Sequence, residues 1–167
     1  MKRNTCNGRN AFSLVELVVV IVIIGIIAAM AIPRLSRGSA GAADSALAGD
    51  LAIMRNAINM YAAEHNSNFP SGTAAEVANQ LTQYSDIDGN TQDSKDGTYK
   101  YGPYLVAVPA CPVVSGTAAD DILIDSTNTP PQVNTTNGEG WVYNPTTGEI
   151  IANSSDTDAS GKAYNTY

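Results

Sequence analysis

The sequence predicts an α+β protein in which one long N-terminal α-helix packs on a small antiparallel β-sheet. Residues 17–32 form an apolar run without a polar side chain, LVVVIVIIGIIAAMAI, and an amphipathic helical pattern follows it. The second half of the chain carries short apolar segments between turn residues, which is the pattern of strands. With 167 residues, the chain is long enough for one domain with a modest core.

The apolar run is expected to cross a membrane. As a helix it covers roughly 24 Å, and the mostly apolar residues 12–15 bring the total near the ~30 Å of a bilayer core. A buried helix of a soluble domain is disfavoured because the run has no amphipathic face. A cleaved secretory signal is disfavoured because Glu16 lies inside the apolar stretch and Pro33 lies just after the Ala29–Ala31 cleavage pattern. The sequence therefore predicts a transmembrane segment at residues 12–33.

The helix is expected to continue well past the apolar run. From Phe12 to Asn66 it would form one rod, apolar in its first half and two-faced in its second. Because Pro33 lacks a backbone donor, a kink is expected there, where the apolar half ends. The core face of the second half is predicted from residues spaced by four, three, four and three: Leu47, Leu51, Met54, Ile58 and Tyr61. A second stripe widens this face: Ile53, Ala57 and Met60.

Shorter elements are predicted after the rod. A capping-box pattern from Thr73 to Glu76 starts a second helix that runs to about Tyr84. The candidate strands or extended segments are residues 104–108, 122–124, 141–143 and 149–152. The last two would form a hairpin around the turn NPTTG.

The residues at the start of the apolar run resemble a known processing signal. The segment AFSLVELVVVIVIIGIIAAMAIPRL follows the basic leader MKRNTCNGRN. Together they are similar to the N-termini of type IV pilins and of type II secretion pseudopilins. The resemblance implies that a membrane-embedded prepilin peptidase cuts between Ala11 and Phe12 and methylates the new amino group of Phe12. The family usually has glycine before the cut, and Ala11 keeps the small side chain that the peptidase needs.

The resemblance also implies a domain organisation and a pilin-like fold. Residues 1–11 would be a cleaved leader, residues 12–33 a transmembrane and assembly helix, and residues 34–167 a periplasmic domain that includes the amphipathic half of the long helix. The subunit would span the bacterial inner membrane once. An assembly platform in that membrane would then stack it, helix against helix, with identical and related subunits in a filament.

The function implied by the resemblance is structural. The chain would be a subunit of the pseudopilus of the type II protein secretion system, a short periplasmic fibre that assists the export of folded proteins. The segments GPYLVAVPACP and GWVYNPTTGEI look like those of major pseudopilins and favour this assignment. The alternative is a type IV pilin of a surface fibre for adhesion, motility or DNA uptake. A third alternative, from a different class, is a signal-anchored secreted enzyme or binding domain.

Glu16 is expected to act in filament assembly. A carboxylate in lipid is costly unless it is paired. The resemblance suggests that Glu16 pairs with the Phe12 amine of a neighbouring subunit, which would set the axial stagger of the fibre. The alternative is that Glu16 reaches the cytoplasmic headgroups from its place near the helix start.

Little in the sequence indicates an enzyme. The only histidine, His65, falls at the predicted end of the rod, where a surface cap is expected. Cys6 would leave with the leader, and Cys111 is then expected to be a buried structural thiol. The formal net charge of −7 argues against a nucleic-acid binder.

Calcium is the one cofactor that the sequence suggests, and ordinary turn chemistry is the alternative. Two clusters have oxygen ligands at suitable spacing. The first is Asp86, Asp88, Asn90 and Asp93, and the second is Asp156, Asp158 and Ser160. The second cluster copies the first half of a calcium loop, but Tyr167 stands where the bidentate glutamate is expected.

Overall fold

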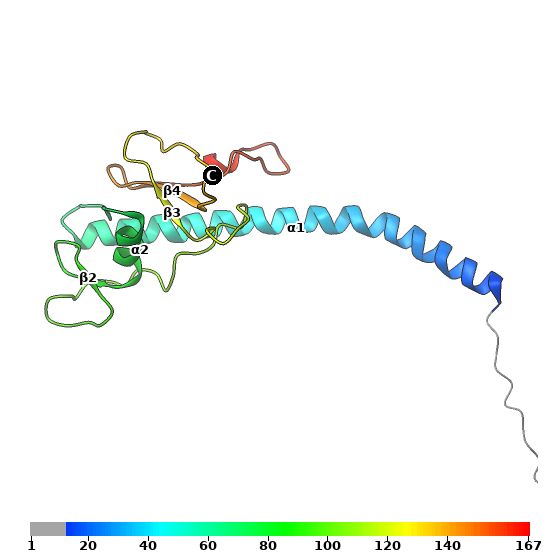
Figure 1. Cartoon of the computed structure of the whole chain (residues 1–167), viewed down its shortest axis with the longest axis horizontal. Helices are drawn as coiled ribbons and strands as arrows, with labels where there is room; N and C mark the ends of the chain where they lie inside the picture. Colours follow the sequence, from blue (N-terminus) through cyan, green and yellow to red (C-terminus); the bar gives the residue numbers. More distant parts are fainter. Residues whose placement is uncertain (1–12) are drawn as a thin grey trace, which may run out of the picture. The chain divides into compact units, whose positions relative to one another are not determined.

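The computed structural model describes the backbone of residues 13–167 and the side chains of residues 13–29 and 41–167. The chain divides into two units, residues 1–39 and 40–167, and each is treated by itself. Figure 1 shows the order of the elements along the chain. The order is α1, α2, β1 to β5 and a final 3-10 helix, η1 (Tyr164–Thr166). The α+β class expected from the sequence is confirmed.

Helix α1 (Leu14–Glu64) is the expected rod, two residues shorter at each end than predicted. Its backbone is helical through Pro33, but the side chains of residues 30–40 are outside the described residues, and the kink at Pro33 stays a prediction. Over the described residues, no helix reaches the length and hydropathy that a membrane crossing requires. The expected span at residues 12–33 extends beyond those residues and also stays a prediction.

The second half of α1 carries the predicted core face. Its five core residues are 0–3% exposed: Leu47, Leu51, Met54, Ile58 and Tyr61. The second stripe is confirmed only at Ala57, which is 2% exposed. Ile53 and Met60 were expected to face the sheet, but they are 54% and 49% exposed. The sheet therefore covers a narrower sector of the helix than the apolar pattern predicted.

Helix α2 (Ala74–Thr82) begins with the predicted capping box. The Thr73 hydroxyl accepts from the Glu76 backbone N–H at 3.3 Å, and the Glu76 carboxylate accepts from the Thr73 N–H at 2.7 Å. The helix ends before Tyr84 because β1 (Tyr84–Ser85) pairs antiparallel with β2 (Thr91–Gln92). This small ribbon was not predicted.

The main sheet has three strands in the order β3–β4–β5: Ile122–Ile124, Trp141–Asn144 and Glu149–Ala152. Strands β4 and β5 form the predicted antiparallel hairpin, with Trp141 opposite Ala152. Strand β3, however, runs parallel to β4, so the prediction of a wholly antiparallel sheet was wrong. The long connection after β3 returns the chain to the same end of the sheet, which makes a parallel pair possible.

The segment 104–108 forms no strand. The backbone N–H groups of Tyr104 and Leu105 both donate to the Leu81 carbonyl, each at 2.9 Å. This contact holds the segment against the end of α2 and buries Leu105, while Val106 is fully exposed. The segment therefore packs by a local contact with a helix end instead of joining a sheet.

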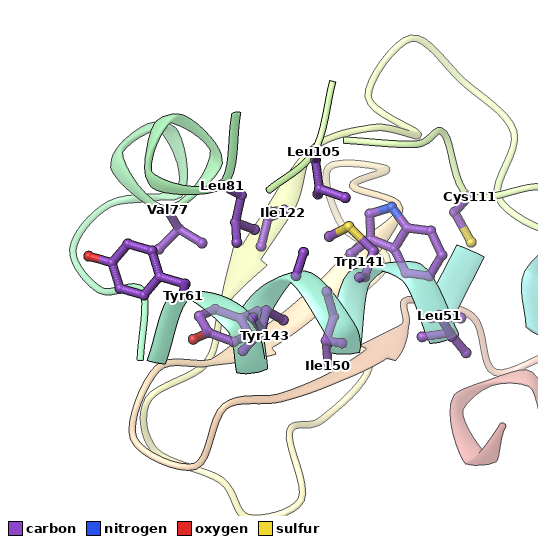
Figure 2. Close-up of a cluster of buried hydrophobic side chains, with 14 of the residues drawn as sticks. Leu51, Tyr61, Val77, Leu81, Leu105, Cys111, Ile122, Trp141, Tyr143 and Ile150 are labelled. Carbon is purple, nitrogen blue, oxygen red and sulfur yellow. The ribbon is translucent and has the colours of Figure 1, made fainter. Parts of the chain in front are cut away.

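The core lies between α1, α2 and the sheet within residues 40–167. Figure 2 shows its buried side chains gathered around α1. Trp141 and Tyr143 of β4 are 0% exposed, and each has its polar atom satisfied. The Trp141 indole N–H donates to the Pro109 carbonyl at 2.8 Å, and the Tyr143 hydroxyl donates to the Pro70 carbonyl at 3.0 Å. One strand thus fastens two loops to the core of the domain.

Candidate functional site

The first candidate site is the start of α1, where Ser13 and Glu16 contact each other. The Glu16 carboxylate accepts a hydrogen bond from the Ser13 backbone N–H at 3.0 Å. The Ser13 hydroxyl accepts from the Val15 N–H at 3.4 Å, and the Ser13 carbonyl accepts from the Leu17 N–H at 3.2 Å. Ser13 is therefore the N-cap of α1, and Glu16 closes the return half of a capping box.

Sequence reasoning missed Ser13. The signal was present, because serine followed three residues later by glutamate, just before an apolar run, is the signature of a helix start. Glu16 was singled out for its charge in an apolar segment and for the resemblance to pilins, and its contact with Ser13 was not predicted. Ala11 and Phe12, the residues expected to flank the cleavage site and to receive the methyl group, lie outside the described residues.

The first unit also has a large exposed apolar surface. Between Leu14 and Ile27 the large side chains of α1 are all strongly exposed, from 43% at Val18 to 78% at Leu14. They point to every side of the helix, so a single neighbouring surface cannot cover them. A helix of this kind is stable only in lipid or among other apolar helices.

The second unit has an uncovered surface of its own, an uncharged stripe along its part of α1. Its exposed residues are spaced by four, three, four, three, four and three: Ala42, Ala46, Gly49, Ile53, Asn56, Met60 and Ala63. At 100° per residue this outer stripe lies on roughly the opposite side of α1 from the core face. A side chain added at Gly49 would meet open space. The outer stripe therefore has the residue pattern of a helix-packing face with small residues, and Asn56 is its only polar member.

His65 is buried, and the expectation of a surface cap was wrong. It is 1% exposed, with Nδ1 2.8 Å from the Tyr61 carbonyl and Nε2 3.0 Å from the Ser85 hydroxyl. A carbonyl can only accept, so Nδ1 carries the hydrogen, and Nε2 accepts from Ser85 in the neutral ring. His65 thus links the end of α1 to strand β1. The misprediction arose because this strand covers the helix end, which the local sequence did not show.

Cys111 is a buried free thiol, as predicted. It is 2% exposed, and burial raises the pKa of its thiol. A buried thiol with a raised pKa is a weak nucleophile. Its backbone N–H donates to the Ala119 carbonyl at 2.8 Å, which ties the loop before β3 together. Cys111 is therefore a packing residue.

The first calcium candidate, residues 86–93, is a turn whose carboxylates do not all point to one place. Asp86 accepts from the backbone N–H groups of Asp88 and Asn90, at 3.0 Å and 2.9 Å, and from the Asn90 side chain at 2.8 Å. Asp93 instead accepts from the Gln83 side chain at 2.8 Å. The structure brings Asp86 and Asn90 together and directs Asp93 toward the end of α2.

The second calcium candidate is also organised as a turn. One Asp158 oxygen accepts from the Ser160 N–H and hydroxyl, both at 2.7 Å, and from the Lys162 N–H at 2.9 Å. The other accepts from the Tyr167 hydroxyl. These donors, Tyr167 first, hold the pKa of Asp158 well below its usual range. Asp156 contributes its backbone, since its N–H donates to the Ser154 hydroxyl and its carbonyl accepts from Tyr164.

Neither loop has the arrangement of a cation cage. In residues 13–29 and 41–167, no three histidine, cysteine, aspartate or glutamate side chains are placed so that they could hold a metal ion. Both oxygens of Asp158 already accept from protein donors, and an ion would have to displace them. The geometry favours the turn alternative, and calcium binding stays a prediction.

The comparison with protein families gives one match, at the N-terminus. Residues 6–32 match the family described as Prokaryotic N-terminal methylation motif, which is a type IV pilin-like prepilin cleavage signal. The match includes Ala11, Phe12 and the Ser13–Glu16 cap. It ends before residues 102–112 and 140–150, on which the resemblance to major pseudopilins rests. No curated protein and no solved structure shows significant similarity to the chain.

The motif supports a type IV pilin-like or pseudopilin-type substrate of prepilin peptidase, and it is a structural pilin-type motif, not that of an enzyme family.

Proposed function

We propose that this protein is a pseudopilin, a structural subunit of the pseudopilus of a type II protein secretion system. Prepilin peptidase removes residues 1–11 and methylates Phe12. Before assembly the subunit is anchored in the inner membrane, with residues 34–167 in the periplasm. It is then extracted and joins a fibre of identical and related subunits on an inner-membrane assembly platform. Its work is mechanical.

The observation that carries this proposal is the uncovered apolar surface of α1. The exposed side chains from Leu14 to Ile27 need lipid before assembly and apolar neighbours after it. In the second unit, the outer stripe from Ala42 to Ala63 is also uncovered and lies opposite the core face. Helix-to-helix stacking would cover both parts with the same surfaces of other copies. A signal-anchored enzyme or binding domain would account for the exposed side chains from Leu14 to Ile27, but it gives no reason for the outer stripe.

Glu16 gives the assembly its register. The cut chain has a positive amine at Phe12, four residues before Glu16 in the sequence. Either charge alone is costly in lipid. A charge pair between the Phe12 amine of one subunit and Glu16 of the next therefore stabilises only the fibre with the correct stagger. The contact of Glu16 with the Ser13 N–H uses Oε2, and the carboxylate can accept further hydrogen bonds.

A surface pilin for adhesion, motility or DNA uptake is the second candidate, and the same helix surface would serve it. The disulfide content favours the pseudopilin. Many type IV pilins close a C-terminal loop with a disulfide, whereas here Cys111 is a free buried thiol and Cys6 would leave with the leader.

The first experiment is mass spectrometry of the N-terminus of the protein purified from membranes. N-methylated Phe12 is the expected first residue. A chain that begins at Ile32 would instead support a secreted protein, and an intact Met1 would leave only a simple anchor. Deletion of the gene then separates the two fibres: loss of protein export indicates a pseudopilus, and loss of surface fibres with normal export indicates a pilus.

A further inference from the structure

We propose that a cavity at the C-terminal end of α1 is a binding site for a neutral carbohydrate. The cavity has a volume of about 480 Å³, which is in the range of small-ligand pockets. Three turns of the second unit meet there: the chain that follows α1, the turn between β1 and β2, and the turn between β4 and β5. This inference goes beyond the proposed function and does not depend on filament assembly.

The lining includes a buried hydroxyl that the protein leaves without a partner. Tyr61 lines the cavity and is 3% exposed, and Figure 2 shows its oxygen pointing away from the core cluster. A buried tyrosine usually finds a hydrogen-bond partner, as Tyr143 does at the Pro70 carbonyl. Among the described residues, none hydrogen-bonds the Tyr61 hydroxyl. Burial, and then the charge of Asp86, raise the pKa of Tyr61 to about 12, so its hydroxyl is a proton donor at neutral pH.

The rest of the lining is mostly polar and carries little charge. The chain leaves α1 through Asn66 and Ser67, whose backbones are left-handed with φ of 55° and 66°. The hydroxyl and carboxamide residues of the lining come from this turn and from the β4–β5 turn: Asn66, Ser67, Asn68, Ser71 and Thr146. Such side chains can both donate and accept hydrogen bonds. Asp88 is the only carboxylate among the described residues that line the cavity, and none of them is a lysine or arginine.

Two larger apolar side chains, Phe69 and Ile87, also line the cavity. The Phe69 ring packs against the β4–β5 turn, where a Cβ at Gly148 would lie 2.5 Å from its Cε1. The glycine at this turn thus leaves the room that the ring occupies. A pyranose ring has hydroxyls around its edge and C–H groups on its faces. It therefore matches a lining in which hydroxyls and carboxamides surround a few apolar groups.

Other classes of ligand fit this lining less well. An anion would meet the Asp88 carboxylate and no basic side chain of the described lining. A calcium or magnesium ion needs several oxygen ligands that include carboxylates, and only one carboxylate is present. An extended peptide commonly pairs with the edge of a sheet, whereas the polar residues here belong to turns. A neutral ligand rich in hydroxyls satisfies the lining without an unpaired charge.

The test titrates the full-length protein with four neutral disaccharides: maltose, cellobiose, lactose and di-N-acetylchitobiose. The protein is kept in a zwitterionic detergent, because glycoside detergents would add sugar headgroups to the sample. Saturation-transfer difference NMR gives the dissociation constant. We expect at least one sugar to bind, and Tyr61→Phe to weaken that binding about threefold to tenfold, the range of one neutral hydrogen bond.

Two further variants separate loss of the site from loss of the fold. Tyr61→Phe removes a hydroxyl that has no partner in the described protein, so it should melt at the wild-type temperature. Asn68→Ala should weaken sugar binding as well. The matched control is Asn59→Ala, at an exposed asparagine of α1 outside the cavity, which should bind sugar as the wild type does.

Three results would overturn the proposal. If none of the four sugars binds, the ligand class is wrong. If Tyr61→Phe and Asn68→Ala bind a sugar as tightly as the wild type does, the sugar lies elsewhere on the protein. If an uncharged capped tripeptide binds where the sugars do not, and Tyr61→Phe weakens that binding, the cavity is a peptide site.

Discussion

The rings of His65 and Tyr61 lie parallel, with their centroids 3.7 Å apart and their planes 3° apart. Tyr61 belongs to the last turn of α1 and His65 directly follows the helix, and the His65 ring also contacts Ser85 on β1. Stacking and hydrogen bonding thus fix the end of the long helix to a segment twenty residues further along the chain. This contact replaces the solvent-exposed helix end that the sequence pattern predicted.

Loss of the His65 ring should strongly destabilise the domain. His65→Ala would remove the imidazole partner of the buried Ser85 hydroxyl and would open a cavity, while the Tyr61 carbonyl would still accept from the backbone N–H of residue 65. We expect a loss of about 2–4 kcal/mol in the free energy of unfolding. Denaturant unfolding of the full chain in detergent measures it, with Asn59→Ala on the exposed side of α1 as the control. Equal midpoints for His65→Ala and wild type would contradict a structural role for the ring.

Asp125 should make the stability depend on acid pH. The Gln132 backbone N–H, followed by Asn128 and Thr127, holds the pKa of its carboxyl well below the usual range. A carboxyl with a lowered folded pKa stabilises the fold above its unfolded pKa of about 4, and this contribution is lost as the pH falls toward the folded value. Asp125→Ala should therefore lower the melting temperature at pH 6, and the difference from wild type should shrink toward pH 2.

The control for this pH dependence is Asp120→Ala, a substitution at an exposed acid. If the difference between Asp125→Ala and wild type stays constant from pH 6 to pH 2, the hydrogen-bonded carboxylate is not its source.

Asp158 should stabilise its loop without calcium. Its oxygens accept from Ser160, Lys162 and Tyr167, so Asp158→Ala should lower the melting temperature equally in calcium and in chelator. Wild-type melting curves should coincide in the two buffers. A chelator-dependent drop that disappears in Asp158→Ala would instead assign calcium to this loop. Asp88→Ala tests the first cluster in the same way.

Glu16→Gln should block assembly without blocking cleavage. Glutamine keeps an acceptor for the Ser13 N–H, so the capping box survives, but the charge that would pair with a neighbouring amine is lost. We expect a chain that inserts, is cut after Ala11 and stays in the membrane fraction. The measurement is the yield of sheared filaments. A wild-type yield from Glu16→Gln would contradict the assembly role.

The outer stripe should be a contact between copies. Met60→Cys places a thiol on it, whereas Ser94→Cys places one on an exposed loop. Cys111 is buried and contributes little background. In assembled fibres a short bifunctional crosslinker should join copies through Met60→Cys and leave Ser94→Cys monomeric. The reverse pattern would place the contact surface elsewhere.

The parts of the fold that depend on local sequence could be predicted. The core face of α1, the Thr73 cap and the β4–β5 hairpin each arise from neighbours within a few residues, where periodicity and turn chemistry act directly. The Ser13 cap was equally local and was overlooked, because the charge of Glu16 drew the interpretation toward assembly.

The remaining features depend on partners that are distant in sequence. The parallel direction of β3, the burial of His65 and the docking of segment 104–108 on Leu81 are each set by a segment far along the chain or across a loop. Such contacts leave no periodic trace in the residues that make them. The same reason explains the second stripe on α1, whose outer members are apolar but not covered by this chain.

Trp141 is the only tryptophan of the chain, and it is fully buried with its indole N–H bound to the Pro109 carbonyl. Its intrinsic fluorescence therefore comes from a single place, the contact between strand β4 and the core. Burial gives blue-shifted emission, and entry of water gives a red shift. The protein thus contains its own optical reporter of the folded domain, which can be read in membranes and in fibres without a label.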